Sequence, residues 1–594
     1  MENTIDSEIK RGGAFLISST DPQSVFMPEE TNEEQEMVRQ MTRDFVNSET
    51  KVRGHILEEQ VSLMDKAGEL GLLGAHIPEQ YGGMGLDTNT NTIISEEIGR
   101  GGGSFNTTFA AHTGIGMLPI LYFGTEAQKQ EYLPKLSSGA WKASYCLTEP
   151  GSGSDALSAK TRADLSEDGK HYLISGQKMW ISNAGFADLM IVFAQVDGDK
   201  FTGFLVEVDS PGLTLGAEEK KMGIKGSSTR QVFFDKVKVP VENVLGTIGK
   251  GHLIAFNALN IGRFKLGNMA MGGAKQAADI SIKYANERVQ FKHPISYFGA
   301  IQHKLAQQAI QVFTLESAVY RVSNLLQQQK HALLEKGDTI EQALLKAAEE
   351  YAIECACLKV AGSEYLDFVV DEAVQIYGGY GFSEEYPPAQ AYRDQRINRI
   401  YEGTNEINRM LMVNMLLKRV MNGTIDMVGP AWEVQKELTR MPSMSKPEGK
   451  FAQEVKALGD YKKLALMVLG AAAKQQMDGT LDLKNEQEIL MNGADLLIDV
   501  FMAESLLLRL QKLNATDRYK LPDVYDAILE VFFYDLNARL AKNASDALCS
   551  FSSGDLLKTF LLGVKRFTAY PAVNVKDKRR IIARHLIKEN KYSL

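Results

Sequence analysis

The sequence predicts a mainly α-helical protein with a central β-domain and an extra helical domain at the C-terminal end. Helical periodicity runs through two long parts of the chain, short alternating segments separate them, and the composition changes again near residue 422. A chain of 594 residues is also expected to form several domains rather than one core. We place the predicted domains at residues 1–142, 143–247, 248–420 and 421–594.

The N-terminal domain is predicted to be helical. Asn32 provides a capping residue, and Leu63, Ala67, Leu70 and Leu73 recur at helical spacing. A glycine-rich break covers residues 77–86, and the helical pattern resumes at Thr92 and continues to about residue 136.

The β-domain is predicted from four segments rich in β-branched and aromatic residues, with glycine and Asp-Gly turns between them. These segments are residues 171–175, 189–194, 201–208 and 231–239. Helical patterns then return near Gly251 and persist to about Val420.

A linker and a second helical region are predicted after residue 422. Proline and glycine at Gly429-Pro430, Pro442 and residues 446–449 indicate the linker. A leucine-rich stripe over residues 494–513 favours the core of a helical bundle over a membrane-surface face. The basic residues near the end of the chain are interpreted as a solvated face; they are Lys576, Lys578, Arg579, Arg580 and Arg584.

The composition of the chain limits which kinds of function are plausible. A net charge of -9 and a pI near 5.7 give no support for nucleic-acid binding. Four scattered cysteines do not form a disulfide framework, and Cys355 and Cys357 point in different directions on a helix, so no metal site is predicted. We find no signal or transit peptide and no apolar run long enough to cross a bilayer, and we expect a cytoplasmic protein.

Glu402 is a candidate general base. It stands between Tyr401 and Gly403 just before a helical run that Thr404 or Asn405 could cap. Burial would raise the pKa of this carboxyl group, as removal of a weakly acidic C–H proton requires. A glutamate near a helix start is also explained by interaction with the helix dipole alone, so the local sequence leaves both interpretations open.

Four further motifs are candidates for ligand binding. The loop 145–155 exposes backbone amides and hydroxyl groups suited to a phosphorylated ligand or an electron-accepting ring, although an ordinary polar turn fits equally well. Trp180 could stack on a planar cofactor or lie in the core. Arg288 could pair with a pyrophosphate and Gly378-Gly379 could admit a nucleotide, or these residues could be a solvated arginine and a helix stop.

Taken together and in order, these motifs resemble the acyl-CoA dehydrogenase family. The matching segments are YCLTEPGSGSD, GQKMWISNAG, KMGIKGSSTRQVFFDKVKVPVENVLG, ERVQF, QIYGGYGF and IYEGTNEI, within residues 30 to 418. GGAFL near the start and the helical tail make the very-long-chain branch the most similar. The resemblance implies helical N-domain, β-barrel middle domain and helical C-domain, with an added C-terminal helical domain.

The resemblance also assigns roles to residues. Glu402 would remove the proton alpha to the thioester carbonyl while the beta hydrogen leaves as hydride to N5 of FAD, and the Glu402 N–H with a flavin hydroxyl would bind the thioester oxygen. FAD contacts would come from Tyr145, Leu147, Thr148, Gly153, Ser154, Trp180, Ile181, Ser182, Thr404 and Glu406, and, for the FAD of a neighbouring subunit, from Arg288, Gln290, Phe298, Gln375 and Gly379. Substrate contacts would come from Ser154, Asn260, Arg263, Tyr401 and Gly403.

The implied partners are an acyl-CoA substrate, an electron-transfer flavoprotein and a second copy of the chain in a homodimer. Residues 421–594 are expected to add dimer surface or to dock on a membrane. Three positions depart from relatives: Gly299 replaces a glutamine, Asn260 replaces an acid, and Ala111 replaces a larger polar residue at the pocket floor, which predicts a deep pocket for long acyl chains.

Two alternatives remain open at this stage. An acyl-CoA oxidase would use the same base but return electrons to O2. A scaffold protein would use the same fold mainly as a binding surface.

Overall fold

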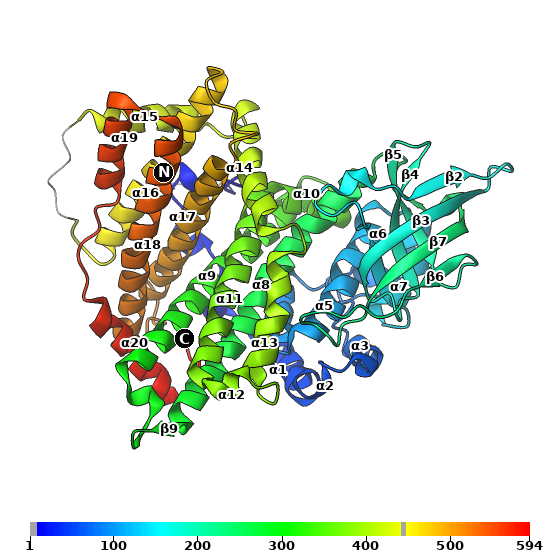
Figure 1. The fold of residues 1–594 in the computed structure, drawn as a ribbon, viewed down its shortest axis with the longest axis horizontal. Helices are drawn as coiled ribbons and strands as arrows, with labels where there is room; N and C mark the ends of the chain where they lie inside the picture. Colours follow the sequence, from blue (N-terminus) through cyan, green and yellow to red (C-terminus); the bar gives the residue numbers. More distant parts are fainter. Residues whose placement is uncertain (1–8, 441–446) are drawn as a thin grey trace.

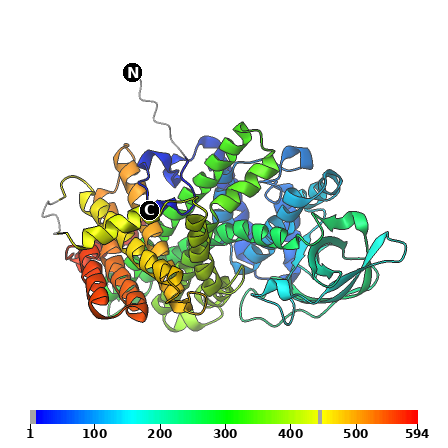
Figure 2. The same cartoon turned by 90° about the horizontal axis from the view of Figure 1, so that it is seen from above.

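A computed structural model describes residues 9–440 and 447–594. The β-domain lies at one end of an elongated molecule, the C-terminal helices lie at the other, and a bundle of long helices occupies the middle (Figures 1 and 2). The predicted mainly α-helical fold with a central β-domain and an added C-terminal helical domain is confirmed.

The N-terminal domain is a set of short helices. They are α1 (Glu33–Phe45), α2 (Lys51–Arg53), α3 (Gln60–Glu69), α4 (Thr88–Gly99), α5 (Gly103–Ala110), α6 (Leu118–Phe123) and α7 (Glu126–Ser137). Asn32 caps α1 as expected, because its side chain accepts the Gln35 N–H. A π-helical turn, Ala111–Gly116, separates α5 from α6. π-Helical turns are rare in proteins, and those that are found frequently lie at functional sites.

The β-domain contains one eight-stranded sheet. Its strands are β1 (Ala143–Cys146), β2 (Arg162–Leu165), β3 (His171–Ser182), β4 (Leu189–Val196), β5 (Lys200–Glu207), β6 (Leu213–Leu215), β7 (Thr229–Pro240) and β8 (Val244–Leu245). They are ordered β6-β7-β3-β2-β4-β5-β8, with β1 parallel to β4. β3 carries register shifts after Ile174 and after Lys178, so it is bulged where its tryptophan lies.

Long helices form the middle bundle. They are α8 (Gly251–Glu287), α9 (Gly299–Glu335), α10 (Ile340–Glu350), α11 (Ala352–Tyr377), α12 (Gly379–Phe382), α13 (Pro387–Gln395) and α14 (Asn405–Met421). A two-stranded hairpin, β9 (Val289–Gln290) with β10 (His293–Pro294), connects α8 to α9. α8 and α11 pack along each other so closely that Gly267 and Gly362 meet, where a Cβ at Gly362 would lie 2.9 Å from the Gly267 Cα.

The C-terminal extension is a further helical bundle. It consists of α15 (Val428–Leu438), α16 (Ala452–Met477), α17 (Gln487–Asn514), α18 (Pro522–Phe551), α19 (Gly554–Phe567) and α20 (Val575–Glu589). The leucine stripe of residues 494–513 lies in α17, and its Leu496, Leu497 and Leu510 are fully buried. The bundle-core interpretation of this stripe is therefore confirmed. The buried apolar residues of α17 join those of α9 and α11 in one continuous core.

The predicted linker is wrong at Gly429-Pro430. Both residues belong to the first turn of α15, where the Gly429 N–H donates to the Asp426 side chain at 3.2 Å. Proline is tolerated there because the first N–H groups of a helix have no partner within the helix. Residues 447–449 are not helical, and Pro442 and Lys446 lie outside the described residues.

The basic end of the chain is not simply a solvated face. Lys578 pairs with Glu530 at 2.8 Å and Arg579 with Asp535 at 2.7 Å, so these residues attach α20 to α18. Within residues 9–440 and 447–594, no helix combines the length and apolar character needed to cross a bilayer.

Candidate active site

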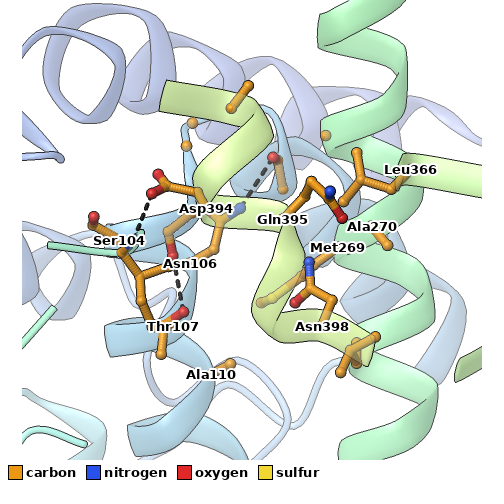
Figure 3. A pocket seen from close by; sticks show the side chains of 18 of the residues that line it. Ser104, Asn106, Thr107, Ala110, Met269, Ala270, Leu366, Asp394, Gln395 and Asn398 are labelled. Carbon is orange, nitrogen blue, oxygen red and sulfur yellow. Dashed lines mark hydrogen bonds between the residues drawn. The ribbon is translucent and has the colours of Figure 1, made fainter. Parts of the chain in front are cut away.

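A cavity of about 390 Å³ lies where the N-terminal domain, the β-domain and the middle bundle meet. It is lined by Ala111 from the N-terminal domain, Ser182 from the β-domain and Glu402 from the loop before α14. Figure 3 shows side chains from α5, α8, α11 and α13 around it, among them Ala110, Ala270 and Leu366. Three separate parts of the sequence thus contribute to one site.

The backbone around Glu402 has an unusual conformation. Glu402 has a φ of 58° and Gly403 a φ of 78°, so two successive residues occupy the left-handed region. A non-glycine residue is held there only when its surroundings fix it, and such residues cluster at functional sites. The turn aims the Glu402 side chain at α8: a Cβ built on Gly262 would lie only 2.6 Å from Glu402 Oε2. The absence of a side chain at Gly262 therefore makes room for the carboxylate.

The environment of Glu402 suits a base. Oε2 is buried without a hydrogen-bond partner among the described residues, and burial raises the pKa of the carboxyl group to about 7, partly opposed by the positive charges of Arg263 and Lys359. Tyr145 of β1 is also close, since the Glu402 charge contributes to raising the pKa of its hydroxyl. Glu402 lies outside the first turn of α14, where Glu406 is the acidic residue, and its carboxylate lies against Gly262 of α8.

The loop that carries Glu402 is held by side chains from two helices. Lys359 of α11 is fully buried and donates to the Gly403 carbonyl and to Asn405 Oδ1, both at 2.7 Å. Asn408 of α14 donates to the Gly403 carbonyl at 2.7 Å and to the Thr404 carbonyl at 3.0 Å. Thr404 is the residue that caps α14, accepting the Ile407 N–H. The backbone carbonyl groups of Gly403 and Thr404 are thus both held by hydrogen bonds.

Two other sequence-predicted substrate residues lie beside this loop. Tyr401 lines the cavity, and its hydroxyl donates to Asn398 Oδ1 at 2.7 Å. Asn260 and Arg263 are buried neighbours on α8, with Arg263 Nη1 donating to Asn260 Oδ1 at 2.9 Å. Arg263 acts on Glu402 through its charge, and the neutral Asn260 leaves that charge uncompensated.

Of the predicted cofactor residues in the β-domain, Ser182 lines the cavity, and the others lie in β1, in the loop after it and in β3. Tyr145 is buried in β1 against Phe193, with ring centroids 5.2 Å apart. Leu147 and Thr148 are half-buried just after β1, whereas Gly153 and Ser154 are exposed in the following loop. The hydroxyls of Thr148 and Ser182 donate to none of the described residues, so both are free to bind a ligand such as the polar edge of a flavin ring.

Trp180 is not a core tryptophan. It is 61% exposed and has a φ of 58°, while the next residue, Ile181, is buried. The bulge in β3 rotates the indole out of the sheet and toward solvent, two residues before the cavity-lining Ser182. An exposed indole at this place offers a flat surface on which a flavin ring can pack. The residues present therefore fit FAD.

A second hollow lies away from this cavity. It is lined by Arg288, Gln290, Gly379 and several tyrosines, and Arg288 lies over the Tyr380 ring at 5.2 Å. Gly378 ends α11 with a φ of 60° and Gly379 begins α12, with open space around both, so they combine a helix stop with room for a ligand. Gln375 is exposed in α11 and Phe298 is half-buried before α9.

The sequence motifs also contain residues whose importance was not predicted. Lys178 is fully buried and donates to Glu149 at 2.7 Å, which joins β3 to the loop after β1. Asn183 donates to the Thr108 carbonyl at 3.0 Å, which joins the β-domain to α5. The roles of Lys178 and Asn183 could have been suspected from the sequence, because both are charged or polar residues inside the β-domain motifs. Gly262 and Lys359 gave no comparable signal, because only the tertiary fold brings them to Glu402.

Comparison with known proteins gives matches along nearly the whole chain. Models of the acyl-CoA dehydrogenase N-terminal, middle and C-terminal domains match residues 32–140, 144–237 and 249–417, and a further acyl-CoA dehydrogenase C-terminal domain model matches residues 460–566. The fourth match covers most of the extension.

Individual relatives agree with these models. A probable acyl-CoA dehydrogenase of Bacillus subtilis (strain 168) is 43% identical over 593 residues, covering 99% of both chains. The very long-chain specific acyl-CoA dehydrogenase of Bos taurus mitochondria is 35% identical, covering 82% of this chain and 76% of that protein. A crystal structure of an acyl-CoA dehydrogenase complexed with FAD from Bacillus anthracis is 43% identical, with a TM-score of 0.94 over 98% of this chain and 100% of that one. The chain therefore belongs to the acyl-CoA dehydrogenase family and is an FAD-dependent oxidoreductase.

Proposed function

We propose that this protein oxidises long-chain acyl-CoA thioesters to trans-2-enoyl-CoA products in fatty acid β-oxidation. The observation that supports the proposal is the shared cavity, which is lined both by Glu402, with its buried carboxylate, and by Ser182, two residues after the exposed Trp180 indole. When bound there, FAD supplies the hydride acceptor of the reaction. The protein must supply a base and an environment that favours the deprotonated substrate.

Glu402 removes the proton from the carbon alpha to the thioester carbonyl. Its raised pKa brings the carboxylate closer in basicity to the weakly acidic C–H bond than an exposed glutamate would be. No acceptor among the described residues takes the Glu402 N–H, so this amide is free to donate to the thioester oxygen and to stabilise negative charge developing there. The apolar cavity keeps water from competing for the base.

The cavity is long enough for a long acyl chain. Its lining along α8 runs from Gly262 to Ile280, which corresponds to about 27 Å of helix. One long lipid acyl chain spans half of a bilayer core, or about 15 Å. Much of the wall is glycine and alanine, including Gly273 and Ala277, which leaves space for methylene groups.

Ala111 should limit the acyl chain length that the cavity accepts. It lines the cavity at the start of the π-helical turn, so an Ala111→Leu side chain would occupy space otherwise filled by substrate. We expect kcat/KM for palmitoyl-CoA to fall about 10-fold or more, the cost of one or more displaced methylenes, while that for butyryl-CoA changes little. The ratio of the two substrates within one variant controls for damage to the fold. A wild-type preference for butyryl-CoA would contradict the deep-pocket assignment.

We propose that an electron-transfer flavoprotein reoxidises the enzyme in the cytoplasm, and that the hollow around Arg288 and Gly379 completes the FAD site of a second copy in a homodimer. Support for the dimer comes from the two sets of lining residues, because this hollow shares none with the Glu402 cavity. We also propose that the extension adds dimer surface or docks on a membrane. Truncation after residue 425 tests both roles. A truncated protein with unchanged dimer size and unchanged liposome association would contradict them.

The visible spectrum of the purified protein under anaerobic conditions tests the proposal. Addition of palmitoyl-CoA should bleach the flavin band, and the reduced enzyme should persist until an electron-transfer flavoprotein is added. Rapid reoxidation in air would identify an acyl-CoA oxidase instead. A protein that takes up no FAD would support the scaffold role, and bleaching only by a short or branched acyl-CoA would retain the chemistry but refute the long-chain assignment.

A further inference from the structure

The C-terminal extension makes direct polar contact with the segment that follows Glu402. Arg409 of α14 donates from Nε to Asp495 Oδ1 of α17 at 2.7 Å. The same guanidinium binds Glu364 of α11 through two hydrogen bonds, from Nη1 at 2.8 Å and from Nη2 at 3.0 Å. Arg409 therefore bridges the extension and the middle bundle with a planar, bidentate geometry that fixes orientation as well as charge.

The chain of contacts continues to the base. Glu364 Oε1 accepts from Asn405 Nδ2 at 3.0 Å, and Asn405 Oδ1 accepts from Lys359 Nζ at 2.7 Å. Lys359 also donates to the Gly403 carbonyl at 2.7 Å, next to Glu402. Lys359 and Asn405 are buried, so a missing partner in this network cannot be replaced by bulk water at low cost.

We propose that the network of Asp495, Arg409, Glu364, Asn405 and Lys359 is a positioning device through which the C-terminal extension fixes the Glu402 loop for proton removal. This proposal rests on the proposed function, because its kinetic test measures flavin reduction by an acyl-CoA substrate. Arg409 is held by Asp495, and its orientation fixes Glu364 and Asn405. Asn405 then sets the place of the Lys359 ammonium group, which holds the strained turn at Gly403.

The groups that face Glu402 make Lys359 the central member of this network. The positive groups are Arg263 on α8 and Lys359 on α11, and burial lowers the pKa of the Lys359 ammonium group to about 7. Tyr145 on β1 and the neighbouring Tyr401 are neutral at physiological pH. Lys359 is the one of the two cations that also binds the backbone of the loop. Its removal should therefore loosen the turn and weaken the attraction that keeps Glu402 deprotonated.

The sharpest test compares two aspartates on one face of α17. Asp495→Asn weakens the contact to Arg409, whereas Asp499→Asn, one turn later, disrupts an ion pair with Arg539 of α18. Hydrogen exchange of the FAD-loaded enzyme, read on peptides covering residues 400–408, reports the loop without any turnover. We expect faster exchange in this segment for Asp495→Asn but not for Asp499→Asn, even though the buried Asp499 variant should lower the Tm more.

The kinetic arm uses Lys359→Met, which keeps the apolar stem and removes the charge. We expect the rate of flavin reduction by saturating palmitoyl-CoA to fall about 10- to 100-fold, the loss typical of a misplaced reacting group. The rise of this rate with pH should move to higher pH, while FAD content stays unchanged; a purely structural role would lower Tm without moving the pH profile.

Two outcomes would overturn the proposal. One is equal exchange at residues 400–408 in both aspartate variants, and the other is an unmoved pH profile in a folded Lys359→Met enzyme. Failure of the proposed function is recognised separately, because wild-type flavin would then not be bleached by any acyl-CoA, whereas the exchange comparison would still report the network. If Lys359→Met does not fold, the half-buried Asp495 decides the matter.

Discussion

Replacing Glu402 with glutamine is expected to abolish flavin reduction by acyl-CoA, with a loss of at least about 10³-fold. Glutamine keeps the size of the side chain but cannot accept the alpha proton. The measurement is the rate of flavin bleaching after anaerobic mixing with palmitoyl-CoA. FAD should remain bound, because the substitution keeps the size of the side chain and Glu402 is not among the predicted flavin contacts. Glu349→Gln, an exposed glutamate on α10, provides the matched control and should react like wild type.

The same substitution should change stability with pH in a defined direction. The pKa of Glu402 is about 7 in the folded protein against 4.5 for an ordinary glutamate, so the folded state binds the proton more tightly than the unfolded state. The contribution of Glu402 to the stability of the wild type therefore falls as pH rises from 4.5 to about 7. A pKa difference of this size corresponds to on the order of 3 kcal/mol, and Glu402→Gln removes the cost.

Glu402→Gln should accordingly be more stable than wild type at pH 8 and similar to it below pH 4.5, where Glu402 is protonated in both states. Chemical denaturation of the two proteins across this range measures the difference. Equal stability at pH 8 would mean that the carboxyl group is not raised in pKa by burial. A wild-type rate of flavin reduction in the variant would remove Glu402 from the role of base.

Gly262→Ala is expected to reduce the rate about 100-fold by displacing the base. A Cβ at Gly262 would lie 2.6 Å from Glu402 Oε2 and 3.1 Å from its Cδ, closer than real Cβ contacts allow. Because the carboxylate is the end of a flexible side chain, it moves while the helix backbone stays. The substitution also replaces a glycine within α8, which should favour the helix by about 1 kcal/mol. The variant should therefore be well folded but slow.

Two controls separate displacement of the base from other effects. Gly459→Ala in α16 makes the same change where nothing lies within 4 Å of the added Cβ, so it should stabilise the protein and leave the rate unchanged. In a Glu402→Gln background, Gly262→Ala should cause no further loss, because the group it displaces no longer acts. A wild-type rate in Gly262→Ala would show that the carboxylate does not need its place against α8.

Much of the fold could be predicted because the pattern of residues reports local structure directly. The leucines of α17 repeat with the period of a helix, and the apolar residues of the β-domain segments repeat with the period of a strand. The buried face of each element could therefore be predicted without a structure. The linker at Gly429-Pro430 was mispredicted since proline interrupts a helix interior but not its first turn. The outcome depended on the position of the proline within the helix, which the composition of the segment does not show.

The sequence by itself determined the order of the domains, the family and the identity of the candidate base, because each is encoded in contiguous segments. Only the tertiary structure decided what surrounds that base. Gly262, Lys359 and Asp495 lie 140, 43 and 93 residues from Glu402 in the chain, and each carries an ordinary local context. Packing α8, α11 and α17 around one strained turn gives these residues their roles: room for the carboxylate, a buried charge beside it and an anchor for its loop.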